Sequence, residues 1–331
     1  MTFYSSNPEQ ENLSFNSGSA DYDMSTSALE VREIPFIDVA DSRLFPNGDT
    51  LYIKQNGQLT KLEGCSLESP RESTKHYFEH VGFTVKGSNQ GNGSGDFIYL
   101  GSDLDTQYIM MDKIQTKQTQ EKKVADRSHY IQATGDLKVF DSLMITPNIQ
   151  SIGKVTIDSR FNGIPLEGHL RIDWDFDDLE VDWIKVNDTI YADSIGFDYS
   201  ASTALRGESL YTGVFLSPKD INPFYPQLLS RVRTLSQKPL LEVNGLFKHK
   251  VGEDVYTFQS GVYEASIPGY TGNMLKYNIN SKRVTGGGAL NLQLRTGPIQ
   301  FKNAGRLVLD LEPNTLSLEL SQSLSIGLPD E

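Results

Sequence analysis

The sequence has a single cysteine, a shortage of positive charge and no long apolar run. With only Cys65, no disulfide can form within the chain and no zinc site can be built on thiolates. We expect Cys65 to be a small buried hydrophobic side chain. No stretch approaches the roughly 18 consecutive apolar residues that a membrane-spanning helix requires. The sequence therefore predicts no transmembrane helix, and no motif in it indicates a cofactor.

Acidic side chains outnumber basic ones. The 331 residues contain 43 acids and 30 bases, which gives a net charge of −13. A surface of this sign repels the phosphates of nucleic acids and anionic lipids, so we expect neither as a partner. Residues 1–19 lack the basic start and apolar stretch of a signal peptide. We expect either a chain retained inside the cell or a segment of a longer protein.

Alternation of apolar and polar residues is the main pattern that the sequence contains. Apolar residues make up 37% of the chain, with 15 tyrosines and 16 phenylalanines, which suit pleated, half-buried surfaces. Period-two alternation is clearest in three stretches, at 170–176, 307–311 and 316–320. Asn-Gly pairs at 56–57 and 162–163 are typical of hairpin turns. The sequence predicts a mostly β fold of long antiparallel sheets, arranged as a meander or a β-sandwich-like array.

Composition suggests three regions. Residues 1–30 are polar and predict a disordered arm, followed by a β domain at 31–134 and a second β domain at 135–331. One helix is predicted near 222–236. Asn222 is a suitable cap and Pro223 suits the first turn, and the helical spacing is carried by Phe224, Leu228, Val232 and Leu235. The glycine-rich stretch 88–95 predicts a flexible loop.

The strands show a weak internal similarity. The segment that begins at Gly135 and continues through Gly153 resembles the one that begins at Gly288 and continues through Gly305. A true repeat would mean that strands stack as units. Chance alternation in a β-rich chain is the alternative.

A run of acids between residues 173 and 182 is the first candidate for a catalytic site. Asp173 and Asp175 are two positions apart, which on a strand is roughly 7 Å, within the range of the paired carboxylates of glycoside hydrolases. Trp174 and Trp183 are candidates for stacking on sugar. Alternation of a wet face and a core face explains the same pattern without chemistry, with both tryptophans in the core.

His76 and His80 are the second candidate, for a metal site. On a helix, residues four apart share one face, as in the H-E-x-x-H zinc motif. The intervening acid, Glu79, is misplaced for that motif. Surface or half-buried histidines without a ligand are the alternative.

Four segments resemble parts of very large, uncharacterised β-rich proteins of Bacteroidetes-type bacteria. They are FIDVADSRLFPNGDTLYI, GDLKVFDSLMITPNIQSIGKVTIDS, IDWDFDDLEVDWIKVNDTIYADSIGFDYS and KYNINSKRVTGGGALNLQL. The resemblance covers about residues 34–331. It implies a secreted, periplasmic or outer-envelope location and a longer parent protein, with no catalytic residues to transfer.

These observations favour a non-catalytic structural or binding segment of a cell-envelope protein, with other envelope proteins or glycan as partners. A carbohydrate-active enzyme or glycan-binding module is one alternative. A lipid- or lipopolysaccharide-handling groove formed by open sheets is another.

Overall fold

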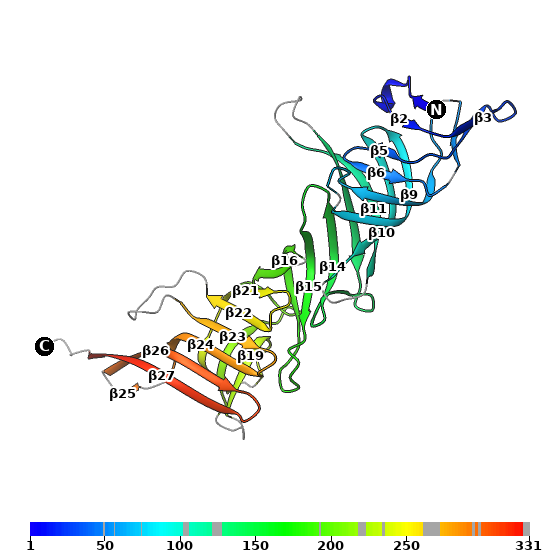
Figure 1. Ribbon diagram of the computed structural model, residues 1–331. Coiled ribbons are helices and arrows are strands. Elements are labelled where there is room, and N and C mark those ends of the chain that lie inside the picture. The colour runs from blue at the N-terminus through cyan, green and yellow to red at the C-terminus, as the bar shows by residue number, and fades with distance from the viewer. Residues whose placement is uncertain are drawn as a thin grey trace. The chain divides into compact units, whose positions relative to one another are not determined.

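The protein is built almost wholly from antiparallel β-strands (Figure 1). The computed structural model describes residues 1–48, 50–55, 57–73, 75–101, 106–120, 128–191, 193–217, 223–233, 236–260, 272–292, 295–296 and 299–326. The expected mostly β fold with long antiparallel sheets is confirmed. Within these residues, helical structure is limited to one short 3-10 turn, Pro8–Gln10, and no helix is long and apolar enough to cross a membrane.

The chain divides into two compact units. The first contains residues 1–143 and 152–167, and the second contains residues 144–151 and 168–331. Strands β14 (Ile149–Asp158) and β15 (Ile164–Ile172) contribute residues to both. The division that the sequence suggested after residue 134 would cut through β12 (His129–Leu137), so the units differ from the expected domains.

A large curled sheet forms the first unit (Figure 1). Its strands follow the order β5 (Ile37–Val39), β6 (Ser42–Phe45), β8 (Leu62–Ser69), β9 (His76–Gly87), β10 (Gln90–Tyr99), β11 (Gln107–Gln118), β12 and β14. Buried side chains on its inner face include Phe78, Phe83 and Met111. The meander order follows from short connections between neighbouring antiparallel strands.

Residues 1–30 are ordered, so the predicted disordered arm is wrong. Strands β1 (Thr2–Tyr4) and β2 (Ser14–Asn16) pair, and β3 (Ser19–Asp23) pairs with β4 (Ala28–Arg32), which also pairs with β7 (Leu51–Ile53). Phe3 and Phe15 stack with ring centroids 5.4 Å apart, and Leu13 is buried. A few apolar residues spaced two apart are enough to order this polar segment, because the rest of the unit supplies the surface they pack on.

The predicted loop at 88–95 is also wrong, since most of it lies in β10. Gly91 and Gly93 are there because neighbouring atoms leave no room for a side chain. A Cβ on Gly93 would lie 2.2 Å from the carbonyl oxygen of Gly82, and one on Gly91 would lie 2.3 Å from the ring of Phe83. The glycines therefore mark close backbone approach within a curled sheet.

The second unit is sandwich-like. Its larger sheet has the order β17 (Ser194–Asp198), β21 (Gly245–Lys250), β22 (Val255–Ser260), β23 (Met274–Asn278), β24 (Arg283–Leu290) and β26 (Ile299–Asp310), with β27 (Thr315–Ile326) also paired to β26 and the two-residue β25 (Arg295–Thr296) paired with its start. A smaller sheet contains β19 (Phe224–Ser230), β18 (Tyr211–Leu216) and β20 (Lys238–Glu242). The side chain of Leu241 lies over Gly286, which brings β20 against β24. Both sheets bury aromatic and aliphatic side chains between them.

The predicted helix near 222–236 is wrong. Phe224–Ser230 is strand β19, paired with β18, while Asn222 and Leu235 lie outside the described residues. Residues 225–230 are all buried, so both faces of the strand are covered. A strand that is buried on both faces has no period-two alternation, and short helices and buried strands cannot be separated by spacing alone.

The internal repeat stays a prediction. Each of its halves is an antiparallel pair, as most neighbouring strands here are. The registers differ, because Gly135 lies opposite Val155 whereas Gly288 lies opposite Gly305.

Candidate functional site

Trp174 is a core residue of the second unit. Its side chain is 1% exposed and packs edge-on against the rings of Tyr256 and Tyr277, with centroids 5.4 and 6.1 Å away. The Tyr277 hydroxyl donates a hydrogen bond of 2.7 Å to the Trp174 carbonyl oxygen. Burial raises the pKa of Tyr277 above its ordinary value. Trp174 is therefore inaccessible to a sugar. Its ring is fixed by packing and its carbonyl group by the hydrogen bond from Tyr277.

The two candidate carboxylates shape a turn. Strand β15 ends at Ile172, so Asp173 and Asp175 follow the strand, although the sequence pattern placed them on it. An Asp173 side-chain oxygen accepts a hydrogen bond of 3.0 Å from the backbone N–H of Asp175. Asp175 has a φ of 50°, and both its carboxylate and its carbonyl accept hydrogen bonds from the ammonium of Lys282. Both acids therefore have a structural role in the turn.

The surroundings of these acids do not resemble those of a glycosidase site. The Asp175 side chain is 73% exposed, whereas a catalytic acid needs an enclosed, dry environment. The open hollow beside them is lined by residues 173, 175–179 and 181. Trp183, which begins β16 (Trp183–Ile190), is half-buried and does not line this hollow. The structure therefore does not assemble the two acids and an exposed tryptophan in one cleft.

The two candidate metal ligands lie on one strand and have different environments. His76 is 3% exposed at the start of β9, whereas the side chain of His80 is 71% exposed and lies 3.1 Å from a carboxylate oxygen of Asp96. Four residues along a strand span roughly 13 Å, too far for one ion to reach both rings. In the part of the chain that the structure describes, no three His, Cys, Asp or Glu side chains are grouped to hold a metal ion.

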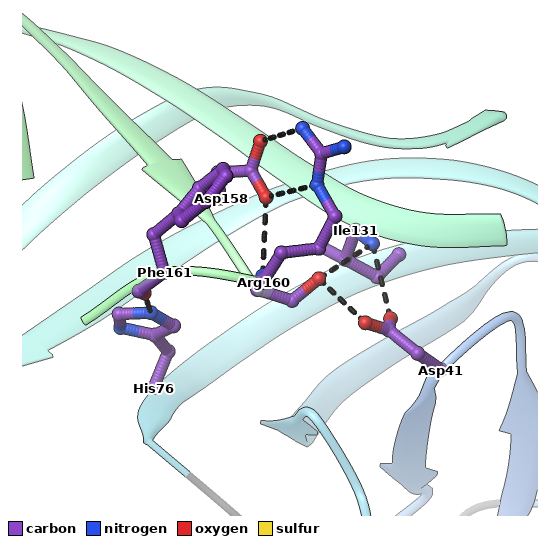
Figure 2. Close-up of polar contacts among 7 residues, drawn as sticks. Asp41, His76, Ile131, Asp158, Arg160 and Phe161 are labelled. Atoms are coloured by element: carbon purple, nitrogen blue, oxygen red, sulfur yellow. Dashed lines mark hydrogen bonds and ion pairs between the residues drawn. The ribbon is translucent and has the colours of Figure 1, made fainter. Parts of the chain in front are cut away.

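The most developed polar site lies in the first unit, and we call it the polar clasp (Figure 2). It joins the turn between β5 and β6, the start of β9, the start of β12 and the turn after β14. Its members are Asp41, His76, Ile131, Asp158, Ser159, Arg160 and Phe161. In the strand order of this sheet β5 is an end strand, and six strands separate it from β14, so the clasp joins strands that are far apart in the sheet.

Asp41 and Ser159 form the centre of the polar clasp. The Ser159 hydroxyl donates a hydrogen bond of 2.6 Å to Asp41. The backbone N–H of Ile131 is shared between Asp41, at 3.1 Å, and the Ser159 oxygen, at 3.2 Å. Ser159 is only 1% exposed. Asp41 itself is half-buried, and these charge-assisted hydrogen bonds stabilise its carboxylate.

Arg160 forms the rim of the clasp. Its guanidinium makes two hydrogen bonds with the buried carboxylate of Asp158, at 2.9 and 2.7 Å, and covers the ring of Tyr130 at 3.7 Å. The backbone N–H of Arg160 donates to the same carboxylate at 3.1 Å. This paired geometry satisfies a charge that would otherwise be costly to bury.

His76 completes the clasp without forming a catalytic triad. Its Nε2–H donates a hydrogen bond of 2.8 Å to the carbonyl oxygen of Phe161, and burial lowers its pKa below the ordinary value. In a serine triad the histidine lies between the hydroxyl and the acid. Here Ser159 donates directly to Asp41, so the three residues stabilise the fold and do not activate a nucleophile.

A separate pocket of about 450 Å³ lies between the N-terminal strands of the first unit and has no charged side chain in its lining. The lining residues are Phe3, Tyr4, Ser5, Ser6, Asn7, Gln10, Leu13, Phe15, Leu29, Ile53, Gln55, Gly57 and Leu59. We call it the neutral pocket. The buried amide of Gln10 is fixed, because its nitrogen donates to the carbonyl oxygen of Gly57 at 2.8 Å and its oxygen accepts from the Ser5 hydroxyl.

The sequence does not predict the neutral pocket, because the polar composition of residues 1–30 predicts a disordered arm. The alternation of Leu13 and Phe15, with Phe3 to pair against, was the signal available. Aromatic, amide and hydroxyl groups without charge are suited to a neutral polar ligand.

The fold and these sites define an all-β protein of antiparallel sheets. No protein-family model, curated protein or solved structure matches the chain.

Proposed function

We propose that the protein is non-catalytic and acts as a structural or binding segment of a β-rich protein of the bacterial cell envelope. The observation that carries the proposal is that side chains of the types used in catalysis make structural contacts instead. Ser159 and His76 are buried in the polar clasp, and Asp173 and Asp175 hold a turn. A catalytic site needs such groups directed at a shared open space. The envelope location is supported by the resemblance of residues 34–331 to large envelope proteins.

The competing functions have less support. An enzyme acting on glycans would need its carboxylates in a cleft beside an exposed aromatic ring, but Trp174 is buried behind them. A lipid carrier would need an open apolar groove. The large apolar side chains on the inner faces of the two main sheets, among them Phe83, Phe247 and Phe258, are instead fully buried.

Hydrolysis assays on wild type and Asp175→Asn test the proposal. The substrates are a panel of p-nitrophenyl glycosides and esters. Asparagine tolerates positive φ and keeps the turn, so this variant should fold. We expect no turnover above a heat-denatured control for either protein. Turnover by the wild type that Asp175→Asn abolishes would overturn the non-catalytic proposal.

Recognition of a neutral glycan at the neutral pocket is a second candidate. None of its thirteen lining residues is charged, in a chain where 22% of residues are charged. The apolar face of a sugar ring packs on aromatic rings, and its hydroxyls bond to amides and hydroxyls. Tyr4, at 77% exposure, and the exposed Gln55 stand ready at the rim, beside the fixed Gln10.

Calorimetric titration with maltotriose, cellotriose and mannotriose tests this candidate, with sialyllactose as an acidic comparison. Tyr4→Ala should weaken binding roughly 5- to 160-fold, because stacking of a ring on an aromatic face contributes about 1–3 kcal/mol. The matched control is Tyr22→Ala, because Tyr22 is also exposed (60%) in the first unit and lies outside the lining. Equal affinity of both variants and wild type would exclude the pocket as the binding site.

A further inference from the structure

Strand β27 is a long edge strand. All twelve of its residues, Thr315–Ile326, pair with β26 in one continuous register without a bulge. Its other side has no hydrogen-bonded neighbour in the described part of the chain (Figure 1, red). Twelve residues at about 3.3 Å each make an edge of roughly 40 Å. Along it, unpaired N–H and C=O groups are available to another strand.

The devices that normally protect an edge are missing from β27. Natural edges are kept short or carry lysine, proline or a bulge. The run 315–323, TLSLELSQS, contains no proline and no basic residue, and Glu319 is its single charge. Strand β5, at one end of the first unit's sheet, is by contrast only three residues long. Strand β19, at an end of the smaller sheet, contains Pro226.

The two faces of β27 differ in chemistry. Leu318 and Leu320 lie on one face and remain 39% and 46% exposed. Ser317, Glu319 and Ser321 lie on the other face and are exposed. A strand that pairs here therefore presents its side chains alternately to a face that carries the leucines and to a polar face.

We propose that a second copy of this chain pairs with it through β27, antiparallel and edge to edge, about a twofold axis at Leu320. In this register Leu320 faces its own copy and Leu318 faces Gln322. On the other face, Ser317 lies opposite Ser323 and Glu319 lies opposite Ser321. No like charges meet, although each chain carries a net charge of −13. A register centred on Glu319 would instead place two carboxylates opposite each other, which is unfavourable.

The second copy is the occupant because β27 itself has the alternation and the low charge that the edge requires. The pairing is isologous, so it closes after two chains. It adds main-chain hydrogen bonds along the edge and covers the exposed leucines, the mode known as β-strand addition. This dimer does not depend on the proposed function, since neither the clasp nor the neutral pocket contributes to it.

Sedimentation velocity and light scattering on the full chain, over a range of concentrations, test the dimer. Wild type should pass from monomer to dimer as concentration rises. Leu320→Lys places two ammonium groups at the axis and should abolish the dimer. The matched control is Leu246→Lys, the same change at an exposed position of β21, inside the sheet. It should leave the dimer intact.

Charge changes at Ser321 test the register. Ser321→Glu sets two glutamates opposite Glu319 of the two copies and should weaken the dimer, whereas Ser321→Lys should strengthen it. Two symmetric pairs change the dissociation constant roughly 2- to 30-fold in each direction. Thermal unfolding checks that every variant folds. If Leu320→Lys does not fold, Ser321→Glu tests the proposal by itself. A wild type that stays monomeric, that grows beyond a dimer, or whose dimer ignores all changes at 320 and 321 would overturn the proposal.

Discussion

Replacing Tyr277 by phenylalanine removes one buried hydroxyl and keeps the ring. The hydroxyl donates to the Trp174 carbonyl oxygen at 2.7 Å, and both residues are almost fully buried. Without it, the carbonyl loses this donor in a dry environment, which costs about 1–3 kcal/mol. The stacking of the ring on Tyr256 is unchanged by the substitution. We therefore expect the free energy of unfolding to fall by this amount.

Tyr99→Phe is the matched control. Tyr99 is 4% exposed, and its hydroxyl has no hydrogen-bond partner among the described residues. Removing a buried hydroxyl that makes no hydrogen bond should leave stability unchanged within about 0.5 kcal/mol, or raise it. The difference between the two variants measures the hydrogen bond to Trp174.

Urea unfolding followed by circular dichroism measures both variants, and its pH dependence adds a second test. Burial raises the pKa of Tyr99 to about 12 and also raises that of Tyr277, against about 10 in the unfolded chain. The folded state holds these protons more tightly. The contribution of these two tyrosines to stability is therefore constant below pH ~10 and falls above it. Each substitution should reduce that alkaline loss. A cost for Tyr277→Phe no larger than for Tyr99→Phe would refute the argument.

Three further substitutions test the first unit and the sheet interiors. Burial lowers the pKa of His76, so the unfolded chain binds the proton more readily and the free energy of unfolding falls as the pH drops below about 6.5. His76→Gln should make this decline shallower in urea unfolding. An equal dependence of the unfolding free energy on pH in both proteins would contradict this. Ser159→Ala should lower the free energy of unfolding by about 1–3 kcal/mol, measured by thermal unfolding. The control Ser14→Ala changes an exposed serine and should lower it by less than about 0.5 kcal/mol. Similar losses in both variants would argue against a stabilising role for the clasp. Gly135→Ala places a Cβ 2.3 Å from the carbonyl oxygen of Met110 on β11 and should lower the free energy of unfolding by about 1–3 kcal/mol or more. Gly196→Ala places its Cβ 3.4 Å from the nearest atom, the carbonyl oxygen of Phe247, and should be tolerated.

Period-two alternation predicted the strands correctly where one face of a sheet is wet. Leu307, Leu309 and Leu316 lie on β26 and β27 as expected. The method failed where burial departs from that case. Residues 225–230 are covered on both faces, so the spacing there predicts a helix where a strand is found. The glycines of 88–95 predict a loop, although Gly91 and Gly93 lie in a crowded strand.

The candidate sites were harder to predict than the fold. The spacing of Asp173 and Asp175 identifies them as a pair of neighbouring acids, but it could not reveal that Trp174 is buried behind them. The polar clasp was not predictable, because Asp41 and Ser159 are 118 residues apart and His76 and Phe161 are 85 apart. No local sequence pattern identifies such pairs, because these residues become neighbours only when the sheet curls.

The sequence by itself therefore determined the class of this protein: acidic, without disulfides, and made of antiparallel strands. Side-chain alternation and turn residues act over a few positions, so they are readable from the chain. Only the tertiary structure decided the roles of particular residues. Burial, hydrogen-bond partners and free edges depend on which strands become neighbours, and period two specifies a face of the sheet without specifying the strand beside it.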